Sequence, residues 1–145
     1  MCTYRVLVGL ALAAFVAAAT AADIGQIKTA KGGVTIERGG ASLPGSVGAR
    51  LQVGDVVKTA ADGSVGITMI DNSRLSAGPN SVLALDRYAF DGTTHEGQMD
   101  ASLRRGTLSV VSGKITKQNP AAMTVRTPNT ILGVRGTEFV VKVED

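Results

Sequence analysis

Short runs of strand-forming residues, separated by glycine-containing turn signals, recur along almost the whole chain. Turn signals such as Arg38-Gly39-Gly40 and Gly78-Pro79 follow one another at intervals of roughly eight to twelve residues. A helix would need a longer uninterrupted run with a period of about 3.6 residues, whereas strands fit between turns at this spacing. We therefore expect an all-β fold, and the 145 residues are enough for one small domain.

The apolar pattern within these runs indicates which faces are buried. Val65, Ile67 and Met69 alternate with small or polar residues, which is typical of a strand with one buried face. Residues 82–85 form an unbroken apolar run, as expected of a strand covered on both faces. Residues 60–63 contain an Asp-Gly pair, which predicts a hairpin-type connection with positive φ angles.

The composition favours short strands and argues against nucleic-acid binding. The chain has 18 glycines, no tryptophan, two tyrosines and three phenylalanines, so its core must come mainly from Val, Ile, Leu and Ala. The formal net charge is only +3. Because the sequence has no basic cluster beyond Arg104-Arg105 and no aromatic stacking platform, we expect no nucleic-acid partner.

The N-terminus has the features of a secretory signal peptide. Arg5 supplies a positive charge, residues 6–19 form an apolar run, and small residues at 19–22 offer a cleavage site. The alternative is an uncleaved membrane anchor, but the run is short for a bilayer and rich in weakly apolar alanine. We expect residues 1–22, with Cys2, to be removed, which leaves no thiol for disulfides, catalysis or metal binding. The remaining domain, residues 23–145, would be periplasmic or secreted and not stably inserted in a membrane.

Residues 127–141 read as a strand, a tight corner and a second strand. Pro128 fixes its own φ and favours extended geometry before it, so the first strand should end at that point. Gly133 and Gly136 bracket the corner, where a Cβ would clash or φ would be positive. After the corner, one face of the second strand is mostly large and apolar, and we expect it to be buried; it carries Thr137, Phe139, Val141 and Val143.

The polar residues at the turns have structural explanations. Asp55 follows a glycine and is expected to accept backbone N–H bonds, and Asp71 is also expected to be a turn residue. Arg135 is expected to donate to carbonyls at the C-terminal corner or to pair with an acid, with ligand recognition as the alternative. Residues 91–98 and 114–121 are polar and are expected to be exposed connections.

The sequence offers little for catalysis. His95 is the only histidine, and its acidic neighbours are Asp91 and Glu96. A zinc site needs three or four ligands with supporting hydrogen bonds, so one histidine without cysteine partners is too few. No nucleophile elbow, phosphate-binding loop, calcium loop or zinc-binding helix motif occurs. We therefore expect no enzyme activity, no cofactor and no bound metal.

Several segments in order along the chain carry a family resemblance: besides the two quoted next, these are residues 63–65, 70–73 and 78–81. Residues 127–141 are similar to the C-terminal signature of the FecR domain family, "tP-x-a-x-x-g-v-R-G-T-x-f", and residues 51–59 are similar to its "L-x-x-G-D-x-v-x-T" segment. The resemblance extends from about residue 25 to residue 143. It implies an all-β domain with a twisted, solenoid-like body, whereas the periodicity alone is equally compatible with a sandwich. The signature positions of this chain are Gly54, Asp55, Thr59, Pro128, Gly133, Arg135, Gly136 and Thr137.

The resemblance also implies a function at the cell envelope. Signalling members combine a cytoplasmic anti-sigma region, one membrane helix and a periplasmic β domain that senses a partner, and this chain resembles only the periplasmic part. We expect an exported, non-catalytic module that binds an unknown envelope protein through a sheet edge or a loop. The alternative is a glycan- or peptidoglycan-associated module, with Tyr88 and Phe90 as an aromatic platform. Together with His95, these two residues form the candidate interaction surface, and the oligomeric state is left open.

Overall fold

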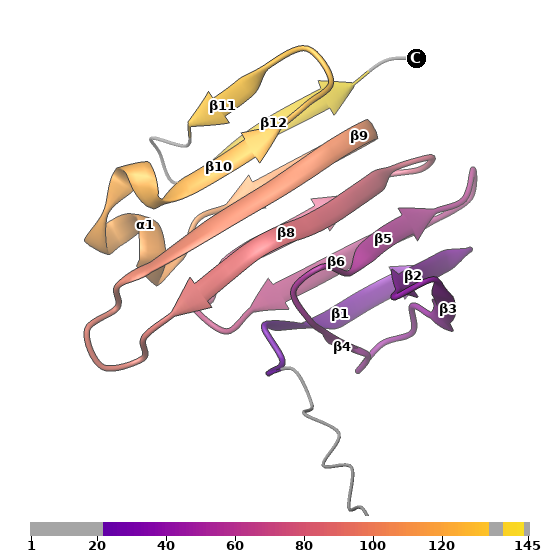
Figure 1. Ribbon diagram of the computed structural model, residues 1–145. Coiled ribbons are helices and arrows are strands. Elements are labelled where there is room, and N and C mark those ends of the chain that lie inside the picture. The colour runs from indigo at the N-terminus through magenta and orange to yellow at the C-terminus, as the bar shows by residue number, and fades with distance from the viewer. Residues whose placement is uncertain (1–21, 134–137, 144–145) are drawn as a thin grey trace, which may run out of the picture.

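The computed structural model describes residues 22–133 and 138–143, which fold into one body dominated by β-strands (Figure 1). The predicted signal peptide, apart from Ala22, and the corner residues Arg135, Gly136 and Thr137 lie outside the described residues. The elements follow in chain order: β1 Gly25–Lys31, β2 Val34–Arg38, β3 Ala41–Pro44, β4 Arg50–Leu51, β5 Val56–Thr59, β6 Ser64–Met69, β7 Arg74–Ala77, β8 Val82–Phe90, β9 Gly97–Val111, α1 Lys114–Gln118, the 3-10 turn Pro120–Ala122, β10 Met123–Arg126, β11 Ile131–Gly133 and β12 Glu138–Val143.

The strands form one curled sheet in the order β3-β2-β5-β8-β9-β7-β6-β1-β4. Neighbours along this path pair antiparallel. β10 then adds to β9 in parallel, and β11 and β12 add antiparallel to β10 and β9. The all-β prediction is confirmed, and the sheet is an antiparallel half-barrel. The solenoid-like body implied by the resemblance is not confirmed: apart from β10 with β9, the paired strands run antiparallel, whereas stacked coils of a parallel β-helix would pair in parallel.

The long strand β9 makes the sheet curl. Residues 97–105 of β9 pair with β8, whereas residues 106–111 pair with β12, and β7 lies on the other side of this second half. Gly106 stands at the change of partner with a φ of +91°, and a Cβ placed there would lie 2.5 Å from the Cα of Ser81. Only glycine fits this conformation and this close approach. The two halves of the sheet consequently face each other across the core (Figure 1).

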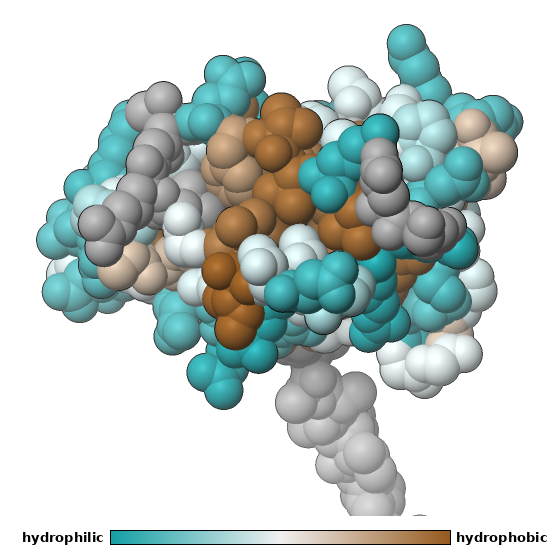
Figure 2. Space-filling view, turned by 90° about the horizontal axis from the view of Figure 1, so that it is seen from above, coloured by the Kyte–Doolittle hydropathy of each residue, from teal (hydrophilic) through white to brown (hydrophobic). Residues whose placement is uncertain are grey.

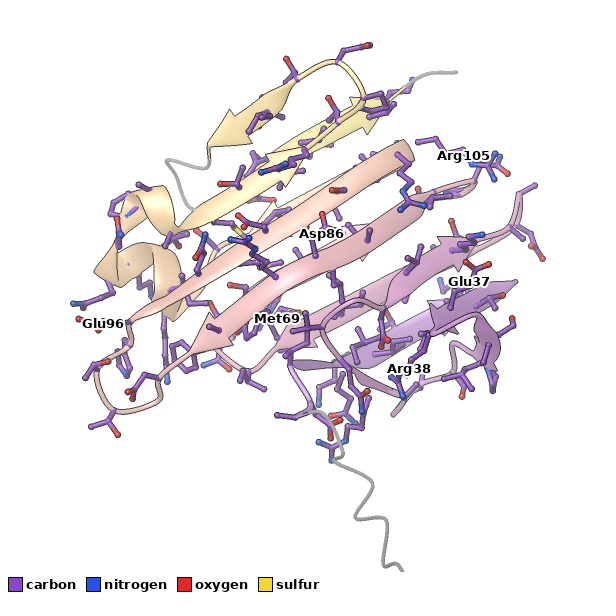
Figure 3. The ribbon with its side chains drawn as sticks, in the orientation of Figure 1. Glu37, Arg38, Met69, Asp86, Glu96 and Arg105 are labelled. Carbon is purple, nitrogen blue, oxygen red and sulfur yellow. The ribbon has the colours of Figure 1, made fainter. Side chains whose placement is uncertain are left out.

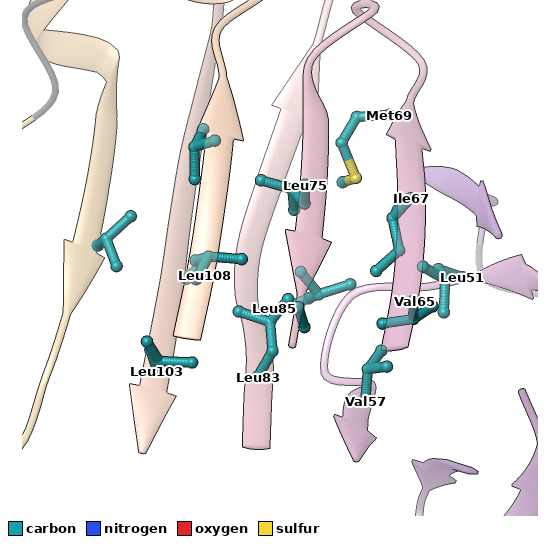
Figure 4. Packing of buried hydrophobic residues seen from close by; sticks show 14 of the residues in the cluster. Leu51, Val57, Val65, Ile67, Met69, Leu75, Leu83, Leu85, Leu103 and Leu108 are labelled. Carbon is teal, nitrogen blue, oxygen red and sulfur yellow. The ribbon is translucent and has the colours of Figure 1, made fainter. Parts of the chain in front are cut away.

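Aliphatic side chains from both halves fill the space between them. Val65, Ile67 and Met69 of β6 are all buried, as their alternation predicts. Residues 82–85 of β8 are buried throughout, so the predicted coverage of both faces is confirmed. Burial of this apolar surface, worth roughly 25 cal/mol per Å², is the main force that holds the half-barrel together. Figure 4 shows part of the cluster, including Leu51, Val57, Leu75, Leu83, Leu85, Leu103 and Leu108.

Two connections differ from the predictions. Residues 60–63 do not form a hairpin, because β5 pairs with β2 and β8 whereas β6 pairs with β1 and β7. Neither Asp62 nor Gly63 has a positive φ, so this turn instead carries the chain from one half of the sheet to the other. Residues 114–121, expected to be an exposed connection, contain the helix α1, whose Ile115 is buried. The sequence around Ile115 is mostly polar, so it did not indicate that this one side chain packs against the rest of the fold.

Both strands of the C-terminal stretch are present. β10 ends at Arg126, shortly before Pro128, as predicted. β12 buries Val141 and leaves Glu138, Val140 and Lys142 exposed, so the predicted inner face is confirmed for the described residues. The expected reason for Gly133 is not supported by the described residues, because its φ is not positive and an added Cβ would meet no described atom within 4 Å.

Candidate interaction surface

The β8–β9 hairpin carries the candidate interaction surface at one end of the molecule. Tyr88 and Phe90 are two residues apart on β8 and therefore lie on the same face of that strand. The loop of residues 91–96 follows and contributes His95. Glu96, at the end of this loop, marks the position of the hairpin tip in Figure 3.

Hydrogen bonds fix the shape of the loop. The carboxylate of Asp91 accepts from the backbone N–H of Thr93 at 2.8 Å and from that of Thr94 at 3.2 Å, and these bonds lower the pKa of Asp91. The backbone N–H of His95 donates to the carbonyl of Asp91 at 2.8 Å. His95 has a φ of 60°, and its ring stacks on Phe90 with centroids 6.0 Å apart and an interplanar angle of 20°. Of the predicted exposed connection, residues 91–96 form a mostly exposed loop in which His95 is half-buried, whereas residues 97 and 98 already belong to β9.

Tyr88 is held by its hydroxyl group. Its side chain is half-buried, and the hydroxyl donates to the carboxylate of Asp71 at 2.8 Å while it accepts from the backbone N–H of Asp71 at 3.1 Å. Burial of the ring and the hydrogen bond to Asp71 raise the pKa of Tyr88. Tyr88 therefore anchors the hairpin to the rest of the fold, and the Phe90–His95 pair, whose side chains are also half-buried, lies beyond it in the hairpin.

Asp71 is fully buried and connects three parts of the chain. Besides Tyr88, its carboxylate accepts from the backbone N–H and the hydroxyl of Ser73, at 3.2 and 2.6 Å, and from the backbone N–H of Ile115 at 3.3 Å. The bonds to Ser73 are those of the predicted turn. Tyr88 and Ile115 lie 17 and 44 residues away, so no local pattern signals them. The carboxylate ties the β6–β7 turn to β8 and to α1, behind the candidate surface.

The first signature segment forms a turn against β8. Gly54 has a φ of +89°, and its N–H donates to the carbonyl of Leu85 at 2.7 Å. The fully buried carboxylate of Asp55 accepts from the backbone N–H of Gln52 at 2.9 Å, which confirms the predicted backbone bond. It also receives Nε and Nη2 of Arg38 at 2.8 and 2.7 Å, and this pairing raises the pKa of Arg38. Arg38 is 17 residues upstream and was not predicted as a partner.

Thr59 and Pro128 occupy two further connections. The hydroxyl of Thr59 donates to the carbonyl of Gly78 at 2.6 Å and accepts from the backbone N–H of Ser81 at 2.9 Å, so it joins β5 to the β7–β8 turn. Pro128 lies in the β10–β11 connection, which with Lys142 lines an open depression of about 440 Å³.

Two open depressions lie beside the hairpin. One, of about 270 Å³, is lined by Val53, Arg87, Tyr88, Ala89 and Gln98. The other, of about 400 Å³, lies between the loop and α1 and is lined by Glu96, Gly97, Gln118 and Asn119. Both are open to solvent.

The described residues contain no group of three or more His, Cys, Asp and Glu side chains placed to hold a metal ion. Of the acid–base candidates, the Asp91 carboxylate accepts hydrogen bonds from loop amides, and the His95 ring stacks on Phe90. Within residues 22–133 and 138–143, no helix is both long and apolar enough to cross a bilayer.

Comparison with known proteins identifies a family. The model of the family described as FecR protein matches residues 55–145. The matched range includes the β8–β9 hairpin, Asp71 with its partners, and the C-terminal strands. No curated protein and no solved structure matches the chain.

Proposed function

Because the chain belongs to the FecR family, we propose that it is an exported, non-catalytic module of the cell envelope that binds or senses a partner protein through the tip of the β8–β9 hairpin. The family indicates an envelope or signalling module and is generally regulatory rather than enzymatic. Export, the lack of catalysis and the contact surface go beyond what membership of the family supports.

The observation that carries the proposal is the Phe90–His95 pair. Five hydrogen bonds donated by backbone amides within residues 91–96 fix the loop that carries His95. A loop already held in one shape loses less conformational entropy on binding. Aromatic side chains are also the residues that most often dominate the energy of protein interfaces. An ordered aromatic pair, half-exposed beside an exposed loop, is therefore suited to contact a partner.

Affinity capture with two single-residue variants tests this surface. Three purified baits are incubated with envelope extract and cross-linked: wild type, Phe90→Ala and Val47→Ala. Val47→Ala is the control, because it removes a 63% exposed valine from a different loop. We expect a discrete partner to be retained by wild type and Val47→Ala and to fall roughly tenfold with Phe90→Ala. Equal capture by all three would exclude the hairpin as the contact surface.

N-terminal sequencing of the exported protein tests the predicted cleavage near residue 22.

A glycan-binding module is the second candidate, because Tyr88 and Phe90 lie on the same face of β8. Against it, Tyr88 is half-buried and its hydroxyl is engaged by Asp71. Cosedimentation with purified sacculi separates the two candidates. Retention of wild type together with loss of retention in Phe90→Ala would favour the glycan module, and the absence of cosedimentation would reject it.

A further inference from the structure

β12 has a long edge that the described chain leaves unpaired. It pairs with β9 along one side, with no shift in register over its six residues, and no strand of the described residues pairs with its other side. The backbone groups on such an edge can add a further strand. β12 carries neither a proline nor a bulge, two of the devices that prevent such pairing, and what marks its edge is two charges, Glu138 and Lys142.

The other edge strands are poorer templates. β4 has two residues and β11 has three, and β3 ends in a proline, which cannot donate a backbone hydrogen bond. β12 is thus the longest unpaired edge among the strands described.

The surface around this edge is apolar. Val140 of β12 is 64% exposed and Ile131 of β11 is 66% exposed, while Leu132, Phe139 and Val143 are only partly buried. Figure 2, viewed onto the end where β11 and β12 lie, shows a continuous apolar area between the two grey segments. Contiguous exposed apolar surface of this kind is typical of an interaction site.

We propose that the chain associates with a second copy of itself by antiparallel pairing of β12 with β12 of the partner copy. In a two-fold arrangement centred on Val140, Glu138 of each copy stands opposite Lys142 of the other. Residues opposite each other in an antiparallel pair project to the same face, so both Glu–Lys pairs form on the outer, exposed face. On the inner face, Phe139 stands opposite Val141 of the other copy, which continues the buried side of the sheet.

The charges select this register. Centring the pair on residue 138 would place Glu138 against its own counterpart, and centring it on residue 142 would do the same with Lys142. Like charges directly opposite are destabilising, whereas opposite charges are favourable. The β12 sequence Glu-Phe-Val-Val-Lys-Val is therefore complementary to itself in one antiparallel register. This contact is separate from the β8–β9 hairpin, so it stands or falls independently of the envelope partner.

Charge reversal with rescue in the mixture is the test, read by sedimentation velocity of the purified chain. Wild type should sediment as a concentration-dependent dimer. Glu138→Lys alone and Lys142→Glu alone each place like charges opposite one another, and each should weaken self-association at least roughly tenfold. An equimolar mixture of the two variants restores both opposite-charge pairs across the interface, so it should dimerise again as a heterodimer.

Lys31→Glu, at an exposed lysine of β1, is the matched control and should dimerise like wild type. Far-UV circular dichroism of every variant verifies the fold. A wild-type chain that stays monomeric at its solubility limit would overturn the proposal. So would single variants that still dimerise, a mixture that stays monomeric, or equal loss of dimer in the control.

Discussion

The hydroxyl of Tyr88 donates a 2.8 Å hydrogen bond to the buried carboxylate of Asp71, 17 residues earlier in the chain. This bond attaches the strand that leads to the hairpin tip to the turn between β6 and β7. Among the described residues, every buried side-chain nitrogen or oxygen has a hydrogen-bond partner. Removing a member of this network therefore leaves a buried polar group unsatisfied, which costs more than the bond itself contributes.

Replacing Tyr88 with Phe should lower the free energy of unfolding by about 1–3 kcal/mol, because the carboxylate and the backbone N–H of Asp71 each lose a partner. Urea denaturation followed by far-UV circular dichroism measures the change. The control Ser102→Ala removes a hydroxyl from an exposed bond to Asp86 and should cost less than about 0.5 kcal/mol. In the double variant Tyr88→Phe/Asp71→Asn, the loss of stability should be smaller than the sum of the two single losses, because the two residues share one hydrogen-bond network. A Tyr88→Phe variant as stable as wild type would contradict this account.

The raised pKa of Tyr88 predicts a loss of stability in alkali. A tyrosine whose pKa is higher in the folded state is equally neutral in both states below its ordinary pKa of about 10, and above that value ionisation favours the unfolded chain. In a Tyr4→Phe variant, Tyr88 is the only tyrosine. The tyrosinate absorbance should then rise above pH 10 together with the loss of the β-sheet circular dichroism signal. Ionisation at the ordinary pKa with an intact fold would show that burial does not protect this hydroxyl.

Neighbouring residues of β2 allow a comparison of two ion pairs of the same length. Arg38–Asp55 and Glu37–Lys58 both have an N–O distance of 2.7 Å, but Asp55 is fully buried whereas Glu37 and Lys58 are 45% and 41% exposed. We expect Arg38→Met to cost about 2–3 kcal/mol, since it strands a buried carboxylate, even after allowing for the partial exposure of Arg38. We expect Glu37→Gln to cost about 0–1 kcal/mol. Chemical denaturation of both variants checks the ranking, and equal costs would mean that burial of Asp55 is unimportant.

Two glycines should respond differently to the same substitution. Gly106→Ala forces a side chain into a φ of +91° and against Ser81, so it should cost about 2–4 kcal/mol. Gly133→Ala places its methyl group where no described atom lies within 4 Å, at an ordinary φ, and should change stability by less than about 0.5 kcal/mol. Thermal melting of the two variants tests the prediction that β9 can change partner only with glycine at residue 106. The reverse ranking would refute that prediction.

Several local features were predictable from the sequence. The alternation at Val65, Ile67 and Met69 indicates the buried face of β6, and the same reasoning applies to β12. Glycines 39 and 40, both with positive φ, turn β2 into β3 where the Arg-Gly-Gly signal predicted a turn. Such predictions succeed because side-chain alternation and turn chemistry depend on residues close together in the chain.

The candidate surface was predictable only in part. Tyr88, Phe90 and His95 do lie in one hairpin, but the stacking of His95 on Phe90 depends on the hydrogen bonds of Asp91 within the loop. The burial of Tyr88 depends on Asp71, whose position relative to β8 is set by strand pairing and not by a local motif. Contacts between residues distant in sequence leave no periodic trace.

The sequence by itself determined that this chain forms strands with assigned inner faces, separated by glycine-containing turns, because each of these properties is encoded within a few neighbouring residues. Only the tertiary structure decided that the strands close into a half-barrel rather than a stack of coils, that β9 belongs to both halves, and that Arg38 and Tyr88 neutralise or satisfy buried carboxylates. The physical reason is that the same alternating strand can pair with different neighbours at nearly equal local cost. The choice is made by the total burial of apolar surface and by satisfaction of every buried polar group, which are properties of the whole fold.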